Sequence, residues 1–475
     1  MEAAKALLQK HWGHTSFRPL QQEIIGSVLA GRDTLAILAT GSGKSLCYQL
    51  PALRLGGLTL VVSPLIALMK DQVDDLNRRK IPAAAWTSAL DARERERIAA
   101  GLRDGSLRLL FVSPERCVQP AFLASLQDQR VRLIAVDEAH CISAWGHNFR
   151  PEYRQLASLR KIFPDVPLVA LTATATPEVR RDIARQLNLV HPQEFVGSFD
   201  RANLTYRVER RKNVELFLRD YLSRHRHDCG IIYCMSRQET EDLAGELKRR
   251  GFAAAAYHAG LPQGIRESVQ EAFLKGGVQA VCATIAFGMG IDKPDVRFVI
   301  HTGMPRSPEA YYQETGRAGR DGRPGECVLL YSPSDAARLR ALASRDGYTP
   351  GSLRAALAKI DAMRDYCETP GCRRRHLLRY FGEAYPRDTC GGCDSCLAGT
   401  GKAAEDALFC RLREVRKSLA QKHRVLPYMI FPDKSLAVMA RTRPSDTSEF
   451  RAIPGVGPYK LAKYGSVFLD AIRAG

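Results

Sequence analysis

Short apolar runs alternate with longer, charge-rich segments through the first two thirds of the chain. The runs lie at residues 34–38, 58–63, 109–113, 133–136 and 168–172, and, after a polar stretch at 198–203, at 230–234, 253–257, 278–283, 298–301 and 326–331. Continuous apolar runs of this length, separated by helical segments, are typical of parallel strands that are buried on both faces. The pattern therefore predicts an α/β fold with two tandem domains, each built on a parallel sheet covered by helices.

Smaller helical parts are predicted after the second α/β domain. Residues from 338 onward are helical in pattern and rich in arginine, and Leu408, Leu412, Val415 and Leu419 mark one face of a later amphipathic helix. Between them lies a short stretch rich in glycine, alanine and lysine. We expect α/β domains at 1–203 and 204–337, a helical cysteine-bearing subdomain at 338–397, a linker at 398–404 and an all-α domain at 405–475.

Composition narrows the class of protein. With 475 residues, 45% of them hydrophobic and 25% charged, the chain can bury several cores and is not disordered. Its net charge of +19 favours a polyanionic partner such as nucleic acid. No apolar stretch approaches the roughly 20 residues of a membrane span, no secretory signal opens the sequence, and the 13 cysteines do not suggest a secreted framework. We expect a bacterial cytoplasmic or nucleoid protein without membrane contact.

Residues 39–45 follow the first predicted strand and have the composition of a phosphate-binding loop. Gly41 and Gly43 let the backbone approach phosphate oxygens, and Lys44 can reach the β- and γ-phosphates. Ser45 can ligate Mg²⁺. Leu38 replaces the first glycine of the general pattern. The nucleotide-binding residues predicted in this loop are Thr40, Gly41, Ser42, Gly43, Lys44 and Ser45.

Two acids and two arginines complete a candidate hydrolytic site with Lys44. Asp137 and Glu138 end the apolar run at 133–136; Asp137 is predicted to hold Mg²⁺, and Glu138 to orient and deprotonate the attacking water. Arg317 and Arg320 can neutralise charge on a departing γ-phosphate. Alone, the acids would suit a helix cap and the arginines surface ion pairs. Together with the phosphate loop they predict nucleotide hydrolysis.

Four cysteines near residue 390 have the spacing of a metal site. Their pattern suits four thiolates on one tetrahedral Zn²⁺, and the ligands predicted are Cys372, Cys390, Cys393 and Cys396. Cys367, just upstream, competes for this role. Free thiols and an iron–sulfur cluster are the alternatives.

Further segments match the motifs of one family in order, namely 17–21, 62–69, 140–153, 171–176 and 287–294. Through residue 396 or so, the chain resembles the RecQ family of superfamily 2 DNA helicases. This resemblance implies two RecA-like domains, a zinc subdomain and 3′-to-5′ polarity. It implies adenine recognition by Phe17, Arg18 and Gln21, and a place for Asp292 in the ATP site. It also implies that Arg320 is an arginine finger supported by Arg317, and that Gln313 relays the state of the γ-phosphate to the DNA side.

The segment 140–153 resembles the aromatic-rich loop that couples DNA binding to ATP hydrolysis in this family. The residues predicted to contact DNA there are His140, Trp145, His147, Phe149 and Arg150, with the aromatic rings stacking on bases. The alternative is that the rings are core. Ala144 and Asn148 depart from the family's usual Gln and Asp, so we expect an elevated ATPase rate without DNA.

The last module resembles the helicase-and-RNase-D C-terminal (HRDC) domain. Its segment 453–460, with Tyr459 and Lys460, is predicted to bind a DNA phosphate through backbone N–H groups, or else to be a tight turn between packed helices. The winged-helix domain that most bacterial relatives carry before this module is missing.

These observations predict an ATP- and Mg²⁺-dependent 3′-to-5′ DNA helicase of recombination, repair and replication, with Zn²⁺ as a structural metal. Alternatives are an ATP-driven annealing or branch-remodelling translocase, an RNA helicase, and a nucleotide-gated DNA clamp. The expected partners are single-stranded and forked or branched DNA, with single-stranded DNA-binding protein as a candidate. A monomer is expected.

Overall fold

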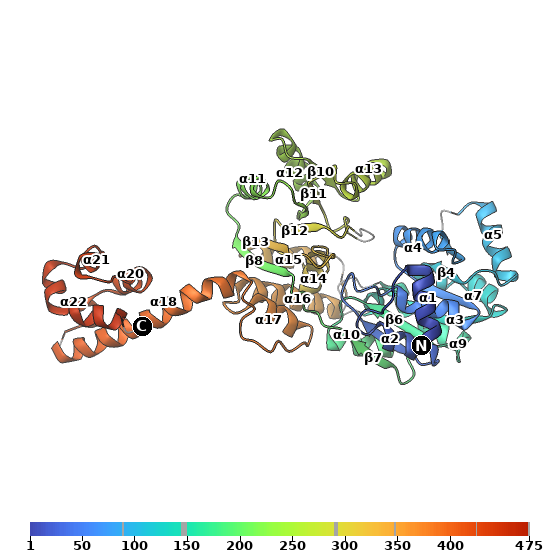
Figure 1. Cartoon of the computed structure of the whole chain (residues 1–475), viewed down its shortest axis with the longest axis horizontal. Coiled ribbons are helices and arrows are strands. Elements are labelled where there is room, and N and C mark those ends of the chain that lie inside the picture. The colour runs from blue at the N-terminus through green and yellow to red at the C-terminus, as the bar shows by residue number, and fades with distance from the viewer. Residues whose placement is uncertain (88–89, 144–149, 289–292, 346–347, 424, 474–475) are drawn as a thin grey trace. The chain divides into compact units, whose positions relative to one another are not determined.

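The computed structural model describes residues 1–87, 90–143, 150–288, 293–345, 348–423 and 425–473 (Figure 1). The chain divides into two compact units. The first unit comprises Met1–Thr369 and Arg373–Asp388, and the second comprises Pro370–Cys372 and Thr389–Gly475. The first unit contains both sheets and the second is helical.

The first sheet has seven parallel strands in the order β3-β4-β2-β5-β6-β1-β7. Its strands are β1 (Thr34–Ile37), β2 (Leu58–Val62), β3 (Ala83–Trp86), β4 (Leu109–Val112), β5 (Val131–Val136), β6 (Leu168–Thr172) and β7 (Gln193–Val196). The central strands β1, β2 and β6 are buried along their whole length, as expected for a sheet covered on both faces.

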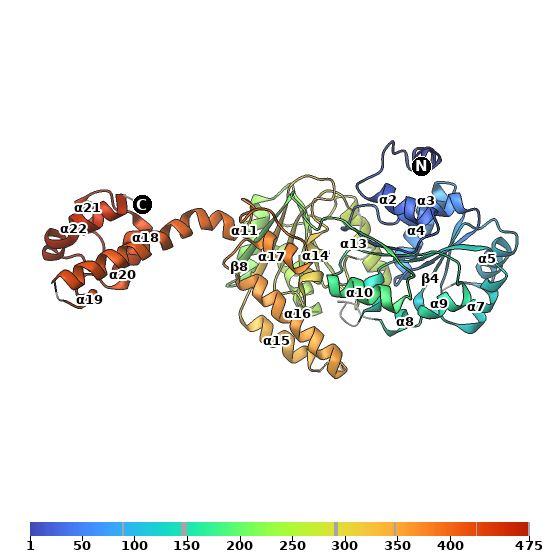
Figure 2. The same cartoon turned by 90° about the horizontal axis from the view of Figure 1, so that it is seen from below.

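Helices cover both faces of this sheet. Figure 2 shows α2, α3 and α4 on one side and α7, α8, α9 and α10 on the other. The bounds are α1 (Glu2–Trp12), α2 (Gln21–Leu29), α3 (Leu46–Leu55), α4 (Ile66–Arg78), α5 (Ala92–Arg103), α6 (Pro114–Cys117), α7 (Pro120–Gln127), α8 (Pro151–Arg154), α9 (Ala157–Ile162) and α10 (Pro177–Gln186), with a 3₁₀ turn at Ala139–Ile142. Cys47 and Tyr48 of α3 pack against strand residues such as Val61 and Leu133 in the core.

The second sheet has six parallel strands in the order β10-β11-β9-β12-β13-β8. Its strands are β8 (Leu204–Arg210), β9 (Cys229–Tyr233), β10 (Ala254–Tyr257), β11 (Ala280–Ala283), β12 (Val296–His301) and β13 (Gly325–Tyr331). The helices of this half are α11 (Val214–Arg224), α12 (Arg237–Arg249), α13 (Gln263–Leu274), α14 (Pro308–Thr315), α15 (Ser334–Ala343), α16 (Pro350–Glu368) and α17 (Arg373–Tyr380). The predicted fold class, with two tandem parallel-sheet domains, is confirmed.

Helix α14 is started by local sequence signals. The Ser307 hydroxyl accepts a hydrogen bond from the Ala310 N–H at 3.1 Å, and Pro308 occupies the first helical turn, where no N–H is needed. The helix ends at Thr315, just before the loop that carries Arg317 and Arg320. Its fixed start therefore helps to position the arginine loop.

The second unit is a helical bundle preceded by the cysteine cluster. Its helices are α18 (Asp394–His423), α19 (Pro427–Ile430), α20 (Asp433–Thr442), α21 (Thr447–Arg451) and α22 (Pro458–Arg473). Leu412, Phe431, Met439, Phe450 and Phe468 are fully buried in its core. The predicted amphipathic face of the first helix is borne out, because Leu408 and Leu412 are core residues and Val415 and Leu419 pack against them.

Two local features differ from the sequence prediction. Residues 398–404, expected to be a linker, continue α18 as helix. Gly399 and Gly401 each disfavour helix by about 1 kcal/mol, but a helix that is already nucleated propagates through such positions. The strands β3, β7 and β8 were not predicted, because β3 is alanine-rich, β7 is a largely exposed edge strand and β8 alternates with charged residues.

Candidate nucleotide site and metal centre

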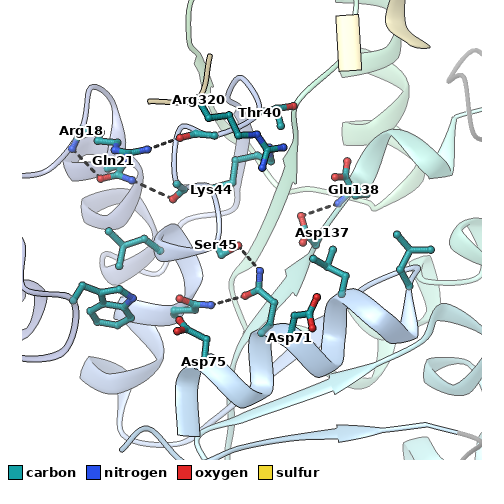
Figure 3. A pocket seen from close by; sticks show the side chains of 18 of the residues that line it. Arg18, Gln21, Thr40, Lys44, Ser45, Asp71, Asp75, Asp137, Glu138 and Arg320 are labelled. Carbon is teal, nitrogen blue, oxygen red and sulfur yellow. Dashed lines mark hydrogen bonds between the residues drawn. The ribbon is translucent and has the colours of Figure 1, made fainter. Parts of the chain in front are cut away.

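The phosphate loop turns between β1 and α3 in the geometry that its glycines were predicted to allow. Gly41 and Gly43 have φ angles of +83° and +82°, which side chains other than glycine rarely adopt. A Cβ atom at Gly43 would lie 2.6 Å from the Gln21 amide nitrogen. Lys44 and Ser45 follow directly, and α3 begins at Leu46, so the loop presents the N-terminus of a helix to the cavity (Figure 3).

The predicted adenine-reading residues are bound to the same loop. The Gln21 amide donates to the carbonyls of Ser42 and Gly43, both at 3.1 Å, and its oxygen accepts from the Arg18 backbone N–H at 2.9 Å. The Arg18 guanidinium donates to the Gly41 carbonyl. Phe17 lines the same cavity. The structure thus brings this segment, far from the loop in sequence, into contact with it.

Ser45 is held by two glutamines that the sequence analysis missed. The Gln72 amide nitrogen donates to the Ser45 hydroxyl oxygen at 2.9 Å, and Gln49 donates to the Gln72 amide oxygen at 2.6 Å. Gln72 lies on α4 and Gln49 on α3. This relay fixes the rotamer of the hydroxyl that was predicted to ligate Mg²⁺. Neither residue has a motif spacing that would have revealed the role.

Asp137 and Glu138 lie at the end of β5, where the chain leaves the sheet. The Asp137 carboxylate accepts from the Glu138 backbone N–H at 2.9 Å, and Glu138 adopts a left-handed φ of 48°. Burial, and then the charge of Glu138, raise the pKa of the Asp137 carboxyl to about 6, against the lowering effect of Lys44. Ser45 and Asp137 supply oxygen ligands of the kind that Mg²⁺ prefers, and a cation beside them would offset the cost of the buried carboxylate.

His140 holds Glu138 in its charged form. The ring is only 2% exposed, with Nδ1 lying 2.8 Å from the Thr172 hydroxyl and 3.2 Å from a Glu138 carboxylate oxygen. Burial would raise the pKa of Glu138, but the hydrogen bond and charge of His140, with the charge of Lys44, lower it to about 2. In the structure His140 is a buried partner of the acidic pair, and its predicted contact with DNA stays a prediction.

The second α/β domain supplies the other residues that line the nucleotide cavity. The Gln313 amide donates to the Thr174 hydroxyl of the first domain at 3.3 Å, and a Cβ atom at Gly41 would lie 3.6 Å from Cγ of Arg320. Arg317 donates to the Gly288 carbonyl, and its charge also lowers the pKa of Glu138. Figure 3 draws Arg320 on the same side of the cavity as Thr40 and Lys44. The predicted catalytic residues therefore meet from both domains.

The cavity between these groups has a volume of about 1130 Å³. It is lined by predicted site residues of both domains, among them Phe17, Lys44, Ser45, Asp137, Glu138, Gln313 and Arg320. This volume is ample for a nucleoside triphosphate. Cationic groups face acidic ones across it, which suits a polyanion bound together with a divalent cation.

Some predicted residues fall outside the described ranges, namely Trp145, His147, Phe149 and Asp292, together with Ala144 and Asn148. Arg150, at the end of the same loop, is described. Its guanidinium donates to the Pro64 carbonyl at 3.0 Å and lies 3.8 Å from a Glu115 carboxylate oxygen. Arg150 therefore connects the aromatic-rich segment to the segment at 62–69, and it also lines the cavity.

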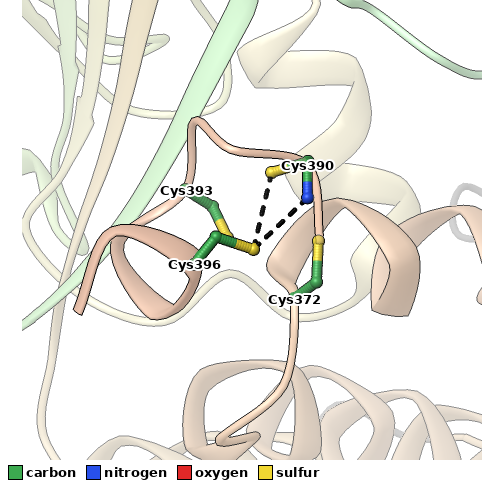
Figure 4. A group of neighbouring side chains, drawn as sticks. All are labelled: Cys372, Cys390, Cys393 and Cys396. Carbon is green, nitrogen blue, oxygen red and sulfur yellow. Dashed lines mark hydrogen bonds between the residues drawn. The ribbon is translucent and has the colours of Figure 1, made fainter. Parts of the chain in front are cut away.

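The four predicted cysteine ligands converge in the second unit (Figure 4). Sulfur atoms of Cys372, Cys390, Cys393 and Cys396 all lie within 4.8 Å of one another, and those of Cys390 and Cys396 are 3.9 Å apart. A tetrahedral Zn²⁺ with bonds of about 2.3 Å spaces its sulfurs by about 3.8 Å. Burial raises the pKa of Cys390, but hydrogen bonds from backbone N–H groups and neighbouring thiols lower it to about 7. Cys367 is buried in α16, outside the cluster.

The loop before α22 is shaped by Gly455, with a φ of +90°. The Ser435 hydroxyl donates to the Pro454 carbonyl at 2.6 Å. Tyr459 is 70% exposed, its hydroxyl accepts from Lys463 at 3.0 Å, and Lys460 lies over the Phe431 ring. The predicted residues Tyr459 and Lys460 thus combine an exposed ring with cations.

Family models match nearly the whole chain. The DEAD/DEAH box helicase model matches residues 18–183, the helicase conserved C-terminal domain 213–322, the RecQ zinc-binding domain 333–397 and the HRDC domain 405–472. No helix in the part of the chain that the structure describes is long and apolar enough to cross a membrane.

Curated relatives agree with these matches, and a solved structure has a similar fold. The chain is 36% identical to the ATP-dependent DNA helicase RecQ of Bacillus subtilis, over all of this chain and 99% of the relative. It is 48% identical to the protein of that name from Haemophilus influenzae over 83% of this chain, and it spans 63% of that relative's length. The crystal structure of the DUF1998 helicase MrfA bound to DNA and AMPPNP has a similar fold, with a TM-score of 0.59 and 17% identity over 80% of this chain and 56% of that one.

Proposed function

The chain belongs to the RecQ family of helicases, and we propose that it is an ATP-dependent DNA helicase that moves 3′ to 5′ along one strand. The observation that carries this proposal is the convergence, in one cavity, of the phosphate loop and acidic pair of the first domain with the arginine loop of the second. A nucleotide there touches both domains, so hydrolysis can change their relative position. The polarity follows from the family resemblance.

In this proposal each described site residue has a separate task. Lys44 and the N-terminus of α3 bind the phosphates. Ser45 and Asp137 hold Mg²⁺, which shields the phosphate charge. Glu138, kept ionised by His140, orients the attacking water and accepts its proton. Arg320 neutralises the charge that develops on the γ-phosphate, with Arg317 in support.

We propose that the DNA strand is held by phosphate contacts and by stacking. The net charge of +19 supplies long-range attraction, Arg150 reaches phosphate, and Trp145 and Phe149 stack on unpaired bases. Because Arg150 also lines the nucleotide cavity, the strand and the nucleotide are linked through one loop. The proposed substrates are single-stranded and forked or branched DNA. The protein would act on them as a monomer in the bacterial cytoplasm or nucleoid, with single-stranded DNA-binding protein as a candidate partner.

We propose that the C-terminal bundle adds a second contact for single strands. Tyr459 offers an exposed ring, and the Lys463 ammonium lies over that ring, while the Lys460 ammonium lies over Phe431. Replacing Tyr459 by alanine should weaken binding of the full chain to an oligonucleotide by roughly 1 kcal/mol or more, the scale of one base–aromatic stack. Tyr348→Ala removes an exposed tyrosine of the other unit and should leave affinity unchanged. Equal affinities for both variants would show that the loop is only a turn.

The activity is tested by strand displacement. With ATP and Mg²⁺, the chain should release a labelled strand from a duplex with a 3′ single-stranded tail but not from one with a 5′ tail, and Glu138→Gln should abolish release. Hydrolysis without displacement would indicate an annealing or branch-remodelling translocase. Tight DNA binding with no hydrolysis would indicate a nucleotide-gated clamp.

A further inference from the structure

Arg201, in the polar stretch that joins the two α/β domains, contacts the loop that carries Arg317 and Arg320. Its Nη1 donates to the Gly316 carbonyl at 3.2 Å, and its Nη2 donates to the carbonyls of Ala318 and Gly319 at 2.9 and 3.0 Å. A guanidinium presents several donors in a fixed plane, so it can hold several carbonyls at set positions, which a lysine cannot do. Arg201 thus forms hydrogen bonds with the backbone on both sides of Arg317.

Asn203 also binds this loop, at positions further along the chain. Its amide nitrogen donates to the Gly319 carbonyl at 2.9 Å and to the Arg323 carbonyl at 2.8 Å. Gly319 has a φ of +57°, and a Cβ atom there would lie 2.4 Å from that nitrogen. The loop is therefore shaped to fit against the joining segment immediately before Arg320.

The joining segment is itself anchored. The buried Arg374 of α17 donates to the carbonyls of Arg201 at 2.7 Å and Leu204 at 2.5 Å. The Tyr312 hydroxyl of α14 donates to the Phe199 carbonyl at 3.0 Å, and the Phe199 N–H donates to Glu383 at 2.6 Å. The position of Arg201 is thus set by two helices of the second half, α14 and α17.

We infer that Arg201 is a positioning residue for the arginine finger: it fixes the backbone from which Arg317 and Arg320 extend into the nucleotide cavity. Arg201 is not among the described residues that line that cavity, so it acts through the loop and not on the nucleotide. This inference rests on the proposed function, because it takes Arg320 as the finger.

Replacing Arg201 by alanine should lower kcat for ATP hydrolysis on single-stranded DNA by about 10- to 100-fold, the scale of a displacement of about 1 Å at a reacting centre. The KM for ATP and the affinity for DNA should stay within about twofold, because the phosphate loop is untouched. Arg201→Lys should recover only part of the rate. Arg207→Ala is the matched control, since this half-buried arginine of β8 pairs with Glu209 and Glu326 and not with the loop.

A double variant separates positioning from a general structural role. If Arg201 acts through Arg320, the rate of R201A/R320A should equal that of R320A within about twofold. Rates that fall by the product of the two single effects would overturn the inference, as would a wild-type kcat in R201A. If R201A does not fold, Asn203→Ala, which removes two of the loop contacts, takes its place. Its rate is then compared with those of R320A and of the double variant N203A/R320A.

Hydrogen exchange gives a readout that does not need activity. Amides of residues 316–323 should exchange faster in R201A than in the wild type, and unchanged in R207A, because only the first variant frees the loop. Unaltered exchange in R201A would overturn the inference even if the protein proved to be no ATPase. Absence of wild-type hydrolysis with faster loop exchange would instead reject the proposed function, and with it the role of Arg320 as a finger, while confirming that Arg201 positions the loop.

Discussion

Arg320 reaches the phosphate loop from the second domain, so its replacement should separate nucleotide binding from hydrolysis. In Arg320→Ala, turnover on single-stranded DNA should fall about a thousandfold or more, the scale of arginine fingers. Nucleotide affinity should change little, because Gln21, Lys44 and the loop amides remain. Phosphate release and titration with a fluorescent ATP analogue measure the two quantities. Arg323→Ala, which replaces an exposed arginine of the same loop, is the control. If Arg320→Ala lost nucleotide binding as strongly as turnover, Arg320 would be a nucleotide-binding residue and not an arginine finger.

Gln72 positions the Ser45 hydroxyl, so replacing Gln72 should raise the Mg²⁺ concentration that the ATPase requires. In Gln72→Ala, the Mg²⁺ concentration for half-maximal ATPase should rise by roughly tenfold, as for other groups that orient metal ligands. The maximal rate at saturating Mg²⁺ should recover. Gln127→Ala, at an exposed position at the end of α7, should behave as the wild type. An unchanged Mg²⁺ requirement in Gln72→Ala would show that the relay from Gln49 does not act on the metal site.

Residues with a chemical signature could be predicted from the sequence, and residues that act through long-range hydrogen bonds could not. Lys44 and Asp137 belong to motifs whose residue types and spacing indicate phosphate and metal binding, and the structure brings both residues into one cavity. Gln72 and Arg201 act through contacts with segments 27 and 115 or more residues away, which no local pattern encodes. The burial of His140 beside Glu138 could not be foreseen, because the sequence shows a polar ring without showing its surroundings.

The cysteine cluster is the element that depends most on a metal. Its sulfurs converge between Cys372 and the first turn of α18, and residues 389–396 contain no large apolar residue besides the cysteines. Metal binding should therefore contribute directly to folding. Cys393→Ser should lose the metal and lower the melting temperature, whereas Cys367→Ser, outside the cluster, should keep about one metal ion per chain.

Elemental analysis of the purified chain identifies the ion. We predict zinc and a colourless protein. Iron with visible absorbance would replace the zinc assignment by an iron–sulfur cluster. Retention of full metal content in Cys393→Ser would contradict the ligand set.

Elements with a strong pattern were predicted, and edge elements were not. The fully apolar β2 and β6 were evident in the sequence because both of their faces are buried. β7 has mostly exposed side chains and is held by pairing with β1, so its own sequence carries little signal. Helix α18 runs through glycines that suggested a linker, because the backbone conformation there is set by cooperativity with the flanking turns.

At the scale of the whole molecule, the two separate sheets account for the proposed control of two domains by one nucleotide. The phosphate loop follows β1 of the first sheet, and the arginine loop precedes β13 of the second. Neither domain alone presents both Glu138, the proposed general base, and Arg320, the proposed arginine finger. The alignment with the Bacillus relative extends over 586 positions, more than the 475 residues of this chain, so that relative holds additional segments.

The decisive experiment is phosphate release by the purified, zinc-containing chain, with and without a single-stranded oligonucleotide. We predict steady ATP hydrolysis that rises when the oligonucleotide is added and disappears in Glu138→Gln. The Ala144 and Asn148 departures predict that some hydrolysis persists without DNA. An intact, folded chain that consumes no ATP in the presence of DNA would rule out an ATP-driven motor.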